Sequence, residues 1–483
     1  PDGYSNTQSA WLNPQAMLQR TSLATAIANG VLNKNSVVKT QQLEQNLGAM
    51  SPQTKQVIEQ TPVRLRTALM MGSPEAMYMK RRNFLRAAGL ATGGLLLPIG
   101  CNSWVVQQAN ASNEKRLVVV FLRGAIDGLN VVIPHQAEEY YAARPTIAIP
   151  YPQEPKGTLD LDGFFGLHPQ LQELMPFWQR RQLAFVHGSG SPVVERSHFQ
   201  AQDYWENGTP GFKNTSDGWM NRLLAQLPQD KATQAVNVGV TTPYILRGKM
   251  AIASLKPGIN STARMPTDNL PVRKAFSELY NGTDPLSSAY QTGNKARDIL
   301  ISELSQEMKK ASRGAKLGDD FIDDAAEVAK LMVGNAKTQL AFMEIGGWDS
   351  HVNQNPLLER SLPPVGKGLA TLAQGLGSIF ADTVIVVISE FGRTVRENGN
   401  KGTDHGYGNA MWLLGGGVRG GQVYGEWRGL DQSALYENRD LPVTTDFREI
   451  FSVILQQHLS VPSDRLEQIF PNYQLANNID FLR

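Results

Sequence analysis

The chain has 483 residues, more than one hydrophobic core usually fills, so we expect two or three domains. Its 46 Lys and Arg residues nearly balance its 44 Asp and Glu residues, which argues against a nucleic-acid partner. A single cysteine, Cys101, excludes an intramolecular disulfide and a metal site made of several cysteines.

The first 79 residues have the pattern of short helices. Apolar residues recur at helical spacing over 17–32, and again over 43–57, where Ser51-Pro52 interrupts them. Thr61-Pro62 begins a further helix that runs to Met71. We therefore expect a helical extension over residues 1–79.

An export signal follows this extension, over residues 80–111. Lys80-Arg81-Arg82 precedes a mildly apolar stretch, 87–99, which is too short for a spanning helix of about 20 residues. The segment closes on Ala109-Asn110-Ala111, a small-residue cleavage site. Paired arginines, a Gly/Ala/Leu-rich core and such a site are typical of a twin-arginine signal.

A lipoprotein interpretation of the same segment is the weaker alternative. Cys101 would carry the lipid, but Pro98 stands where such a signal requires a small or aliphatic residue. We therefore expect a periplasmic or secreted protein whose mature chain has no transmembrane helix, with anchoring at Cys101 as the less favoured outcome.

Residues 112–483 alternate apolar runs with helical patterns. The runs suited to buried strands lie at 117–122, 183–186, 339–345, 383–388 and 411–414. The helical patterns lie at 170–180, 197–207, 320–333, 369–380 and 445–459. This alternation predicts an α/β fold with a mainly parallel central sheet flanked by helices. Residues 265–318 hold further helices, which we expect to form a cap over the sheet edge.

Side chains with metal-binding chemistry gather where these strands end. In α/β folds, ligands bind outside the carboxyl ends of the strands. Carboxylates and imidazoles at such an edge suit a divalent cation, Zn²⁺, Mn²⁺, Mg²⁺ or Ca²⁺. The candidate metal ligands are Asp127, Asp349, His351 and Glu390, which follow strands, and Asp404 and His405, which lie just before the fifth strand.

Several of these residues also have structural explanations. Asp127 precedes a glycine and suits a turn, while Asp349 suits a loop cap and Glu390 a salt bridge. Asp349 and His351 stand two apart after a strand, so both side chains can turn toward one point. The shared location of all these groups, rather than any single pair, predicts the metal site.

Two residues near the same strand ends suit catalytic roles. Ser197 opens a helix, where it suits an N-cap or a nucleophile whose hydroxyl a metal activates. The free N–H groups of the helix start would then hold an anion. Arg393, and less clearly Arg123, suits bidentate binding of a small anionic ester substrate.

The chain from about Lys115 to near its C-terminus also carries a resemblance to a known family. The segments VVVFLRGAIDGLNVVIPH, RSHFQAQDYWENG, GGWDSHVNQ and VISEFGRTVRENGNKGTDHGYGNAMWLLGGGVRGG resemble the domain-of-unknown-function 1501 family (DUF1501). That family is grouped with the alkaline phosphatase and sulfatase superfamily and is exported by the twin-arginine route in many bacteria. The resemblance implies an alkaline phosphatase-like fold and a metal-dependent hydrolase of phosphate or sulfate esters.

The superfamily pattern is matched unevenly. The matching positions are Asp127 for the first ligand, Ser197 for the nucleophile, and Asp349, His351 and His405 for later ligands. The Asp-His pair of the superfamily has become Glu390-Phe391, which keeps a carboxylate and loses an imidazole. One metal position is therefore poor in ligands. This loss favours the alternative function, a non-catalytic binding or scaffolding protein of the cell envelope.

Residues 1–79 resemble a second family. The segment LRTALMMGSPEAMYM, with its Ser73-Pro74-Glu75, is similar to the C-terminal end of the domain-of-unknown-function 1800 family (DUF1800). Genes of that family often sit beside those of DUF1501. The resemblance implies two neighbouring proteins joined near Met79, and a DUF1800-family protein as a partner.

Overall fold

In the computed structural model, the chain forms two compact units. The larger holds Val105–Met250, Leu255–Gly258 and Ser312–Arg483, and the smaller holds Pro1–Trp104, Ala251–Ser254 and Ile259–Ala311. The residues described are 17, 20–22, 24–25, 28, 50–77, 114–212, 215–228, 233–239, 242–255, 270–308, 320–334, 338–475 and 479–483. The expected export signal and Cys101 lie outside these residues. Among the described helices, none is both long and apolar enough to cross a membrane.

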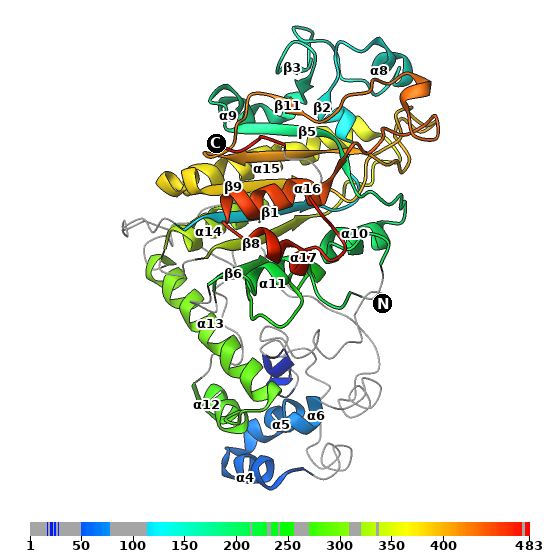
Figure 1. Ribbon diagram of the computed structural model, residues 1–483. Helices are drawn as coiled ribbons and strands as arrows, with labels where there is room; N and C mark the ends of the chain where they lie inside the picture. The colour runs from blue at the N-terminus through cyan, green and yellow to red at the C-terminus, as the bar shows by residue number, and fades with distance from the viewer. Residues whose placement is uncertain are drawn as a thin grey trace. The chain divides into compact units, whose positions relative to one another are not determined.

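The centre of the larger unit is a group of parallel strands (Figure 1). β1 (Arg116–Leu122) pairs in parallel with β8 (Leu340–Ile345) on one side and with β9 (Thr383–Ile388) on the other. β6 (Ala235–Val238) extends the sheet in parallel beyond β8. Every residue of β1 is buried, as its unbroken apolar sequence predicts for a strand covered on both faces.

The other half of the sheet is mixed. β10 (Asn409–Gly415) runs antiparallel to both β9 and β5 (Leu183–Gly190). Two short strands, β11 (Val423–Tyr424) and β12 (Thr445–Asp446), pair in parallel with β5. The strand order is β11-β5-β10-β9-β1-β8-β6-β7, where β7 is Ala253–Leu255. The structure confirms the predicted α/β class, and each of the five predicted strands is present.

Helices cover the sheet. α14 (Asp320–Val333) packs along α15 (Gln354–Gly375) on one face, and α16 (Phe447–Val453) lies on the other (Figure 1). α15 begins at Gln354 rather than at the predicted residue 369, because it continues through Pro363 and Pro364, which sequence rules treat as a stop. The end of the predicted helix is a separate 3-10 segment, Gly377–Asp382.

Short elements complete the larger unit. Three of them, β2, β3 and β4, form a small antiparallel sheet of order β2-β4-β3. In chain order the remaining elements are η1 (Gly128–Asn130), β2 (Val132–Ile133), α8 (Glu138–Ala143), β3 (Leu159–Asp160), β4 (Gly166–Leu167), η2 (Pro169–Leu174), α9 (Met175–Gln179), α10 (His198–Asn207), α11 (Trp219–Leu224), η3 (Tyr244–Leu246), η6 (Gln432–Ala434), η7 (Ile454–His458), η8 (Ser463–Arg465) and α17 (Leu466–Ile469).

The smaller unit is helical. It contains α4 (Pro52–Gln60), α5 (Val63–Met71), α6 (Pro74–Met77), α12 (Leu270–Leu279) and α13 (Pro285–Met308). Ser51 caps α4 by accepting a hydrogen bond from the backbone N–H of Thr54, in agreement with the Ser-Pro signal in the sequence. Helices from the N-terminal extension and from the 265–318 region therefore fall in one unit. A role of that region over the substrate stays a prediction.

Candidate metal centre

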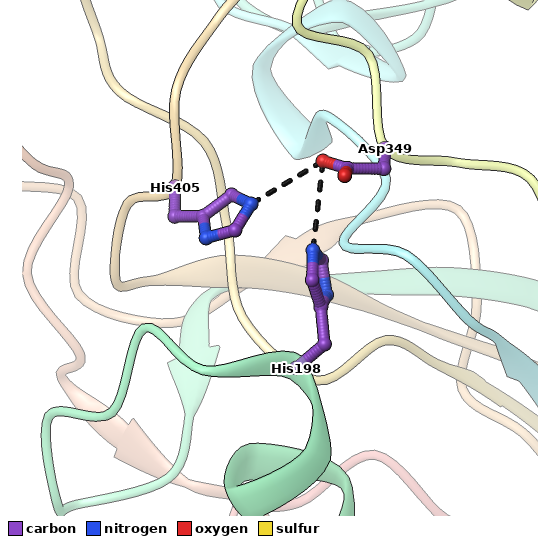
Figure 2. A group of neighbouring side chains, drawn as sticks. All are labelled: His198, Asp349 and His405. Atoms are coloured by element: carbon purple, nitrogen blue, oxygen red, sulfur yellow. Dashed lines mark hydrogen bonds and ion pairs between the residues drawn. The ribbon is translucent and has the colours of Figure 1, made fainter. Parts of the chain in front are cut away.

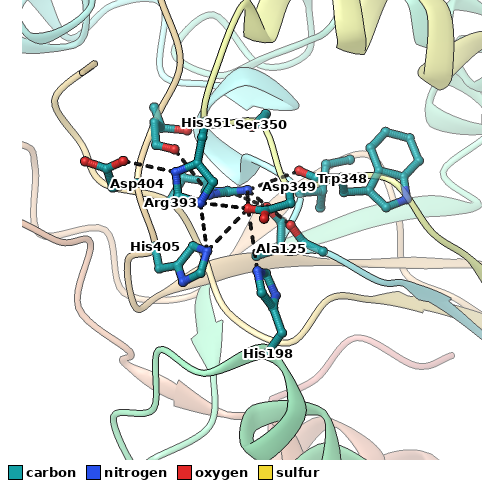
Figure 3. A network of polar contacts seen from close by, with 12 residues as sticks. Ala125, His198, Trp348, Asp349, Ser350, His351, Arg393, Asp404 and His405 are labelled. Carbon is teal, nitrogen blue, oxygen red and sulfur yellow. Dashed lines mark hydrogen bonds and ion pairs between the residues drawn. The ribbon is translucent and has the colours of Figure 1, made fainter. Parts of the chain in front are cut away.

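Three loops of the larger unit bring two imidazoles and a carboxylate together. His198 is the first residue of α10, Asp349 follows the end of β8, and His405 lies in the loop between β9 and β10. One ligand atom from each of the three lies within 4.8 Å of the others (Figure 2). A fourth side chain, His351, adjoins them (Figure 3).

One oxygen, Oδ1 of Asp349, is the centre of this group. It lies 3.0 Å from Nε2 of His351, 3.3 Å from Nε2 of His405 and 3.5 Å from Nε2 of His198. The Nε2 atoms of His351 and His405 are 3.0 Å apart. Ligand atoms held about 2.0–2.1 Å from a tetrahedral Zn²⁺ are about 3.3 Å from one another, so the spacing fits a small cation.

The other ring nitrogen of each imidazole meets an acceptor. An imidazole whose Nδ1–H donates keeps its lone pair on Nε2, which is how metal-binding histidines are oriented. The acceptors are Glu390 Oε1 for His198 (2.8 Å), Asp404 Oδ1 for His351 (3.0 Å) and the backbone oxygen of Arg196 for His405 (2.8 Å). The three lone pairs then face the same carboxylate oxygen, and a cation or proton among these atoms removes their repulsion.

The side chains of the group differ in their exposure to solvent. The Nε2 atom of His198 is buried without a hydrogen-bond partner, which is costly unless another group binds it. The side chains of Asp349 and His351, in contrast, are 45% and 40% exposed. The group is therefore closed to solvent around His198 and open to solvent beside Asp349.

Electrostatics keep the carboxylates ionised. Burial alone would raise the pKa of Asp349, but the hydrogen bond and charge of Arg393 lower it. Burial likewise opposes ionisation of Glu390, whose pKa is lowered by hydrogen bonds from His198 and Gln202. Asp404 behaves in the same way: hydrogen bonds from Asn398 and His351 outweigh its desolvation and lower its pKa.

The pKa values of His198 and His405 are shifted in opposite directions. The hydrogen bond to Glu390 raises the pKa of His198 against the effect of burial. Burial is the main reason that the pKa of His405 is lowered, and the nearby His198 and Arg393 add to it. A neutral His405 and an anionic Asp349 are the protonation states that a cation requires of its ligands.

Glu390 is not one of the three grouped side chains, but it contacts the far nitrogen, Nδ1, of His198. Its side chain is fully buried, and Oε1 accepts hydrogen bonds from His198, from Gln202 Nε2 (2.8 Å) and from the backbone N–H of Gly124 (2.9 Å). A carboxylate with these donors orients the His198 ring and raises its basicity. Asp404 supports His351 similarly, so neither carboxylate belongs to the three-residue group.

Asp127, the first candidate ligand, lies in a different network. Its carboxylate forms a buried ion pair with Arg144, and it accepts hydrogen bonds from the Leu129 backbone N–H (3.1 Å) and from Gln354 Nε2. Gln354 in turn accepts from Ser350 and Thr403 beside the cluster. The structure therefore places Asp127 as a support for the loops, capping η1 as the turn interpretation predicts.

Arg393 is saturated by protein acceptors instead of facing a substrate. The guanidinium is buried and pairs with Asp349. Its other acceptors are the backbone oxygens of Ala125 (2.8 Å), Thr403 (3.2 Å), Gly124 (3.2 Å) and Trp348 (3.3 Å). Its place is that of a positioning residue, which fixes Asp349 and joins three loops (Figure 3).

The two remaining catalytic candidates are Ser197 and Arg123. Ser197 is the exposed N-cap residue of α10, and its side chain makes no capping hydrogen bond. Arg123 pairs with Glu206 at 2.9 Å and with Glu344 at 2.6 Å; these carboxylates raise its pKa although burial acts to lower it. His198 belongs to the group although it is not among the predicted ligands; it stands next to Ser197, whose hydroxyl fits the predicted nucleophile.

Glycines allow the loops to meet. Gly124 has φ of +116°, and a Cβ there would lie 2.8 Å from the backbone nitrogen of Asp349. A Cβ on Gly402 would lie 2.3 Å from the backbone carbon of His351. Side chains at these two positions would push the ligand-bearing segments apart, so the glycines are part of the site.

Comparison with known proteins agrees with the predicted family. The model of the family described as "Protein of unknown function (DUF1501)" matches residues 114–470. This match leaves out residues 1–79, so their resemblance to DUF1800 stays a prediction. No curated protein matches the sequence.

Solved structures with a similar fold share little sequence with the chain. Ps i-CgsB in complex with k-i-k-neocarrahexaose has 9% identity and a TM-score of 0.32 over 72% of each chain. A protein in the alkaline phosphatase superfamily from Vibrio parahaemolyticus has 12% identity and a TM-score of 0.27, over 64% of this chain and 62% of that one. The C-terminal periplasmic domain of EcEptC from Escherichia coli, in complex with Zn, has 11% identity and a TM-score of 0.30, over 66% and 77%.

The family match covers most of the larger unit, from β1 through α17, and includes every residue of the cluster around Asp349. This chain therefore belongs to the DUF1501 family.

Proposed function

We propose that the protein is an exported metal-dependent hydrolase of phosphate or sulfate esters. The observation that supports this proposal most is the convergence of imidazole Nε2 atoms on Asp349 Oδ1, at 3.0–3.5 Å. Each ring has an acceptor behind it, and one side of the group is open. Export is supported by the paired arginines at 81 and 82 and by the Ala109-Asn110-Ala111 cleavage site.

The metal ligands in this proposal are His198, Asp349 and His405. Three protein ligands with one open position are typical of a catalytic zinc site, and two imidazoles with a carboxylate favour Zn²⁺ or Mn²⁺ over Mg²⁺ or Ca²⁺. A divalent cation there supplies Lewis acidity, which lowers the pKa of water and stabilises charge on an ester oxygen.

The residues of the chain hold this arrangement in place. Arg393 fixes Asp349, while Glu390 holds the Nε2 lone pair of His198 toward the open site. Both supports are buried, so water does not compete for them. The cluster is therefore organised before a substrate arrives, and preorganisation of this kind carries much of the rate enhancement of hydrolases.

We assign proton transfer to His351. Its ring is partly exposed, and Asp404 accepts its Nδ1–H and holds the ring in one tautomer. In the reaction, water attacks phosphorus or sulfur and gives a proton to the Nε2 lone pair of His351, the ester P–O or S–O bond breaks, and His351 then passes that proton to the leaving oxygen. A positioned general acid of this kind contributes about 10²–10⁴-fold to a rate.

The test is metal analysis of purified protein combined with hydrolysis of p-nitrophenyl phosphate and p-nitrophenyl sulfate. We expect one metal ion per chain, and Asp349→Ala to weaken metal binding by at least about 100-fold and to abolish hydrolysis, because it removes the central ligand. His351→Gln should retain the metal and lose about 100-fold or more in turnover. Asp431→Ala, at an exposed N-cap without a side-chain cap, is the matched control.

A scaffolding function is the second candidate, and one observation favours it. Phe391 stands where the superfamily has an imidazole, and its buried ring packs 5.0 Å from the ring centres of both His198 and His405. A protein without metal, whose unfolding temperature does not change in chelator and which hydrolyses neither ester, would support scaffolding and contradict the hydrolase.

A further inference from the structure

The hydrophobic core of the smaller unit comes from two stretches that are far apart in the sequence. One is the N-terminal segment with α4 and α5, and the other is the α12–α13 pair. The shared cluster of buried side chains is Met17, Ala24, Val57, Ile58, Leu65, Leu69, Met70, Met71, Val272, Ala275, Phe276, Leu279, Tyr280, Leu286, Ala289 and Tyr290. Among the described residues, each stretch buries its apolar side chains against the other.

The packing between the two stretches is specific. The Phe276 ring lies against Gly72 so closely that a Cβ there would be 2.5 Å from Cε1. The buried hydroxyl of Tyr280 donates to the backbone oxygen of Gly72 at 2.6 Å. Gln53 Nε2 donates to Asn281 Oδ1 at 2.8 Å. An aromatic ring fitted to a glycine and a buried directional hydrogen bond fix one register between α5 and α12.

The N-terminal half depends on this contact for its structure. α4 and α5 have 9 residues each, and isolated helices shorter than about 12–15 residues are marginal in water. Residues 57, 58, 65 and 69–71 are buried in the shared core. Their apolar side chains would face water without α12 and α13, so tertiary packing supplies most of the stability of α4 and α5.

We propose that α12 and α13 form a docking surface, defined by Val272, Phe276, Leu279, Tyr280 and Tyr290, whose occupant is the segment 50–77 of this chain. The surface holds that segment by noncovalent contact, so the segment stays bound after the chain is cut between residues 80 and 111. This inference is independent of the proposed hydrolase, because it concerns other residues and a binding equilibrium.

The position of the expected signal explains why such a surface matters. A cut after Ala111, at the small-residue site, would separate residues 1–111 from the rest of the chain. The core would then be an interface between two polypeptides.

The experiment uses the full chain with a site-specific protease sequence in place of residues 105–111 and an affinity tag at the N-terminus. After complete cleavage, we expect the tag to retain the untagged C-terminal fragment under native conditions and to release it in denaturant. Separation of the fragments under native conditions, in a sample whose uncut chain is folded by circular dichroism, would overturn the proposal.

Two variants and one control test the surface itself. Phe276→Ala should release the fragment at least about 100-fold faster, since it empties the ring's place against Gly72. Tyr280→Phe keeps the ring and loses one buried hydrogen bond, so the affinity should fall about fivefold while the fold is retained. Val63→Ala changes an apolar residue of α5 that is 76% exposed and should have no effect. Equal release by the control and by Phe276→Ala would contradict the assigned surface.

Discussion

Two networks of charged side chains support neighbouring loops of the larger unit, and they are built in opposite ways. Asp127 is buried with Arg144, whose guanidinium neutralises it and also donates to backbone oxygens of the 394–395 segment. Asp349 is half-exposed and is surrounded by imidazoles with a lone pair directed toward it. Its guanidinium partner, Arg393, approaches from the buried side.

The difference separates a carboxylate whose partners are all protein donors from one that can still bind a cation or proton. Both carboxylate oxygens of Asp127 accept hydrogen bonds from protein donors, so we call the Asp127–Arg144 pair closed: neither oxygen is left for another ligand. Asp349 keeps a side that faces solvent and other acceptors, and this arrangement is stable only with a cation or proton present. The contrast teaches that the partners of a strand-end carboxylate, rather than its place in the sequence, decide which role it has.

Breaking the closed Asp127–Arg144 pair should have the largest effect, a loss of folding stability. We expect Asp127→Ala to lower the free energy of unfolding by about 3–5 kcal/mol, because it leaves the Arg144 guanidinium buried without its counter-charge. Urea unfolding measures this loss, with Asp431→Ala as control. Metal affinity of the folded variant should change by less than about tenfold, because Asp127 supports the loops and does not bind the cation. A stable variant that has lost its metal would reverse the assignment of the two networks.

The pH dependence of stability tests a buried imidazole outside the cluster, that of His187. His187 is buried beside Phe165 and Trp427, with Nε2 bonded to the backbone oxygen of Val132, and burial lowers its pKa to about 4. The unfolded chain takes up this proton near its ordinary pKa of about 6.5, so stability is full above pH 6.5 and falls as the pH drops toward 4.

This loss amounts to at most about 3 kcal/mol for one group. Urea unfolding at intervals between pH 7 and pH 4 measures it, and His187→Gln should flatten the curve by that amount. An unchanged slope in the variant would mean that His187 is not the buried neutral group that titrates.

Glu390 supports the open cluster around Asp349, and removing its charge should have a smaller effect, on metal affinity. Glu390→Gln keeps the shape of the side chain and removes its charge, so we expect metal affinity to fall about 10–100-fold while one ion still binds at saturation. Calorimetric titration with Zn²⁺ gives the affinity. Glu344→Gln, which changes a carboxylate at the end of β8 that pairs with Arg123, serves as control. Complete loss of binding would make Glu390 a direct ligand.

The fold could be predicted from the sequence more fully than the site could. Unbroken apolar runs such as 117–122 and 383–388 mark buried strands without knowledge of their neighbours, and the structure confirms them. The site depends on pairings across long separations. The sequence does not show that Arg144 reaches Asp127, or that Arg393 turns inward to Asp349 and to backbone oxygens of three loops. Asp349 and His351 follow the same strand, so the sequence predicts that they lie together. His405 precedes β10 and reaches the same edge because β10 runs antiparallel to β9. His198 is not among the predicted ligands.

Substitution of Ser197 should have the smallest effect of these changes. Its outcome decides whether water or the Ser197 hydroxyl attacks the ester. The Ser197 side chain is exposed at the N-cap of α10, while the next residue, His198, points into the cluster. We therefore expect Ser197→Ala to leave Zn²⁺ affinity within about twofold and ester hydrolysis within about tenfold, since loss of a covalent nucleophile costs several orders of magnitude. Stopped-flow measurement of p-nitrophenol release, with Ser191→Ala as the serine control, distinguishes the cases. A rate reduced about 1,000-fold with full metal content, or a burst that the variant loses, would restore Ser197 as the nucleophile and require its hydroxyl to turn toward Asp349 during the reaction.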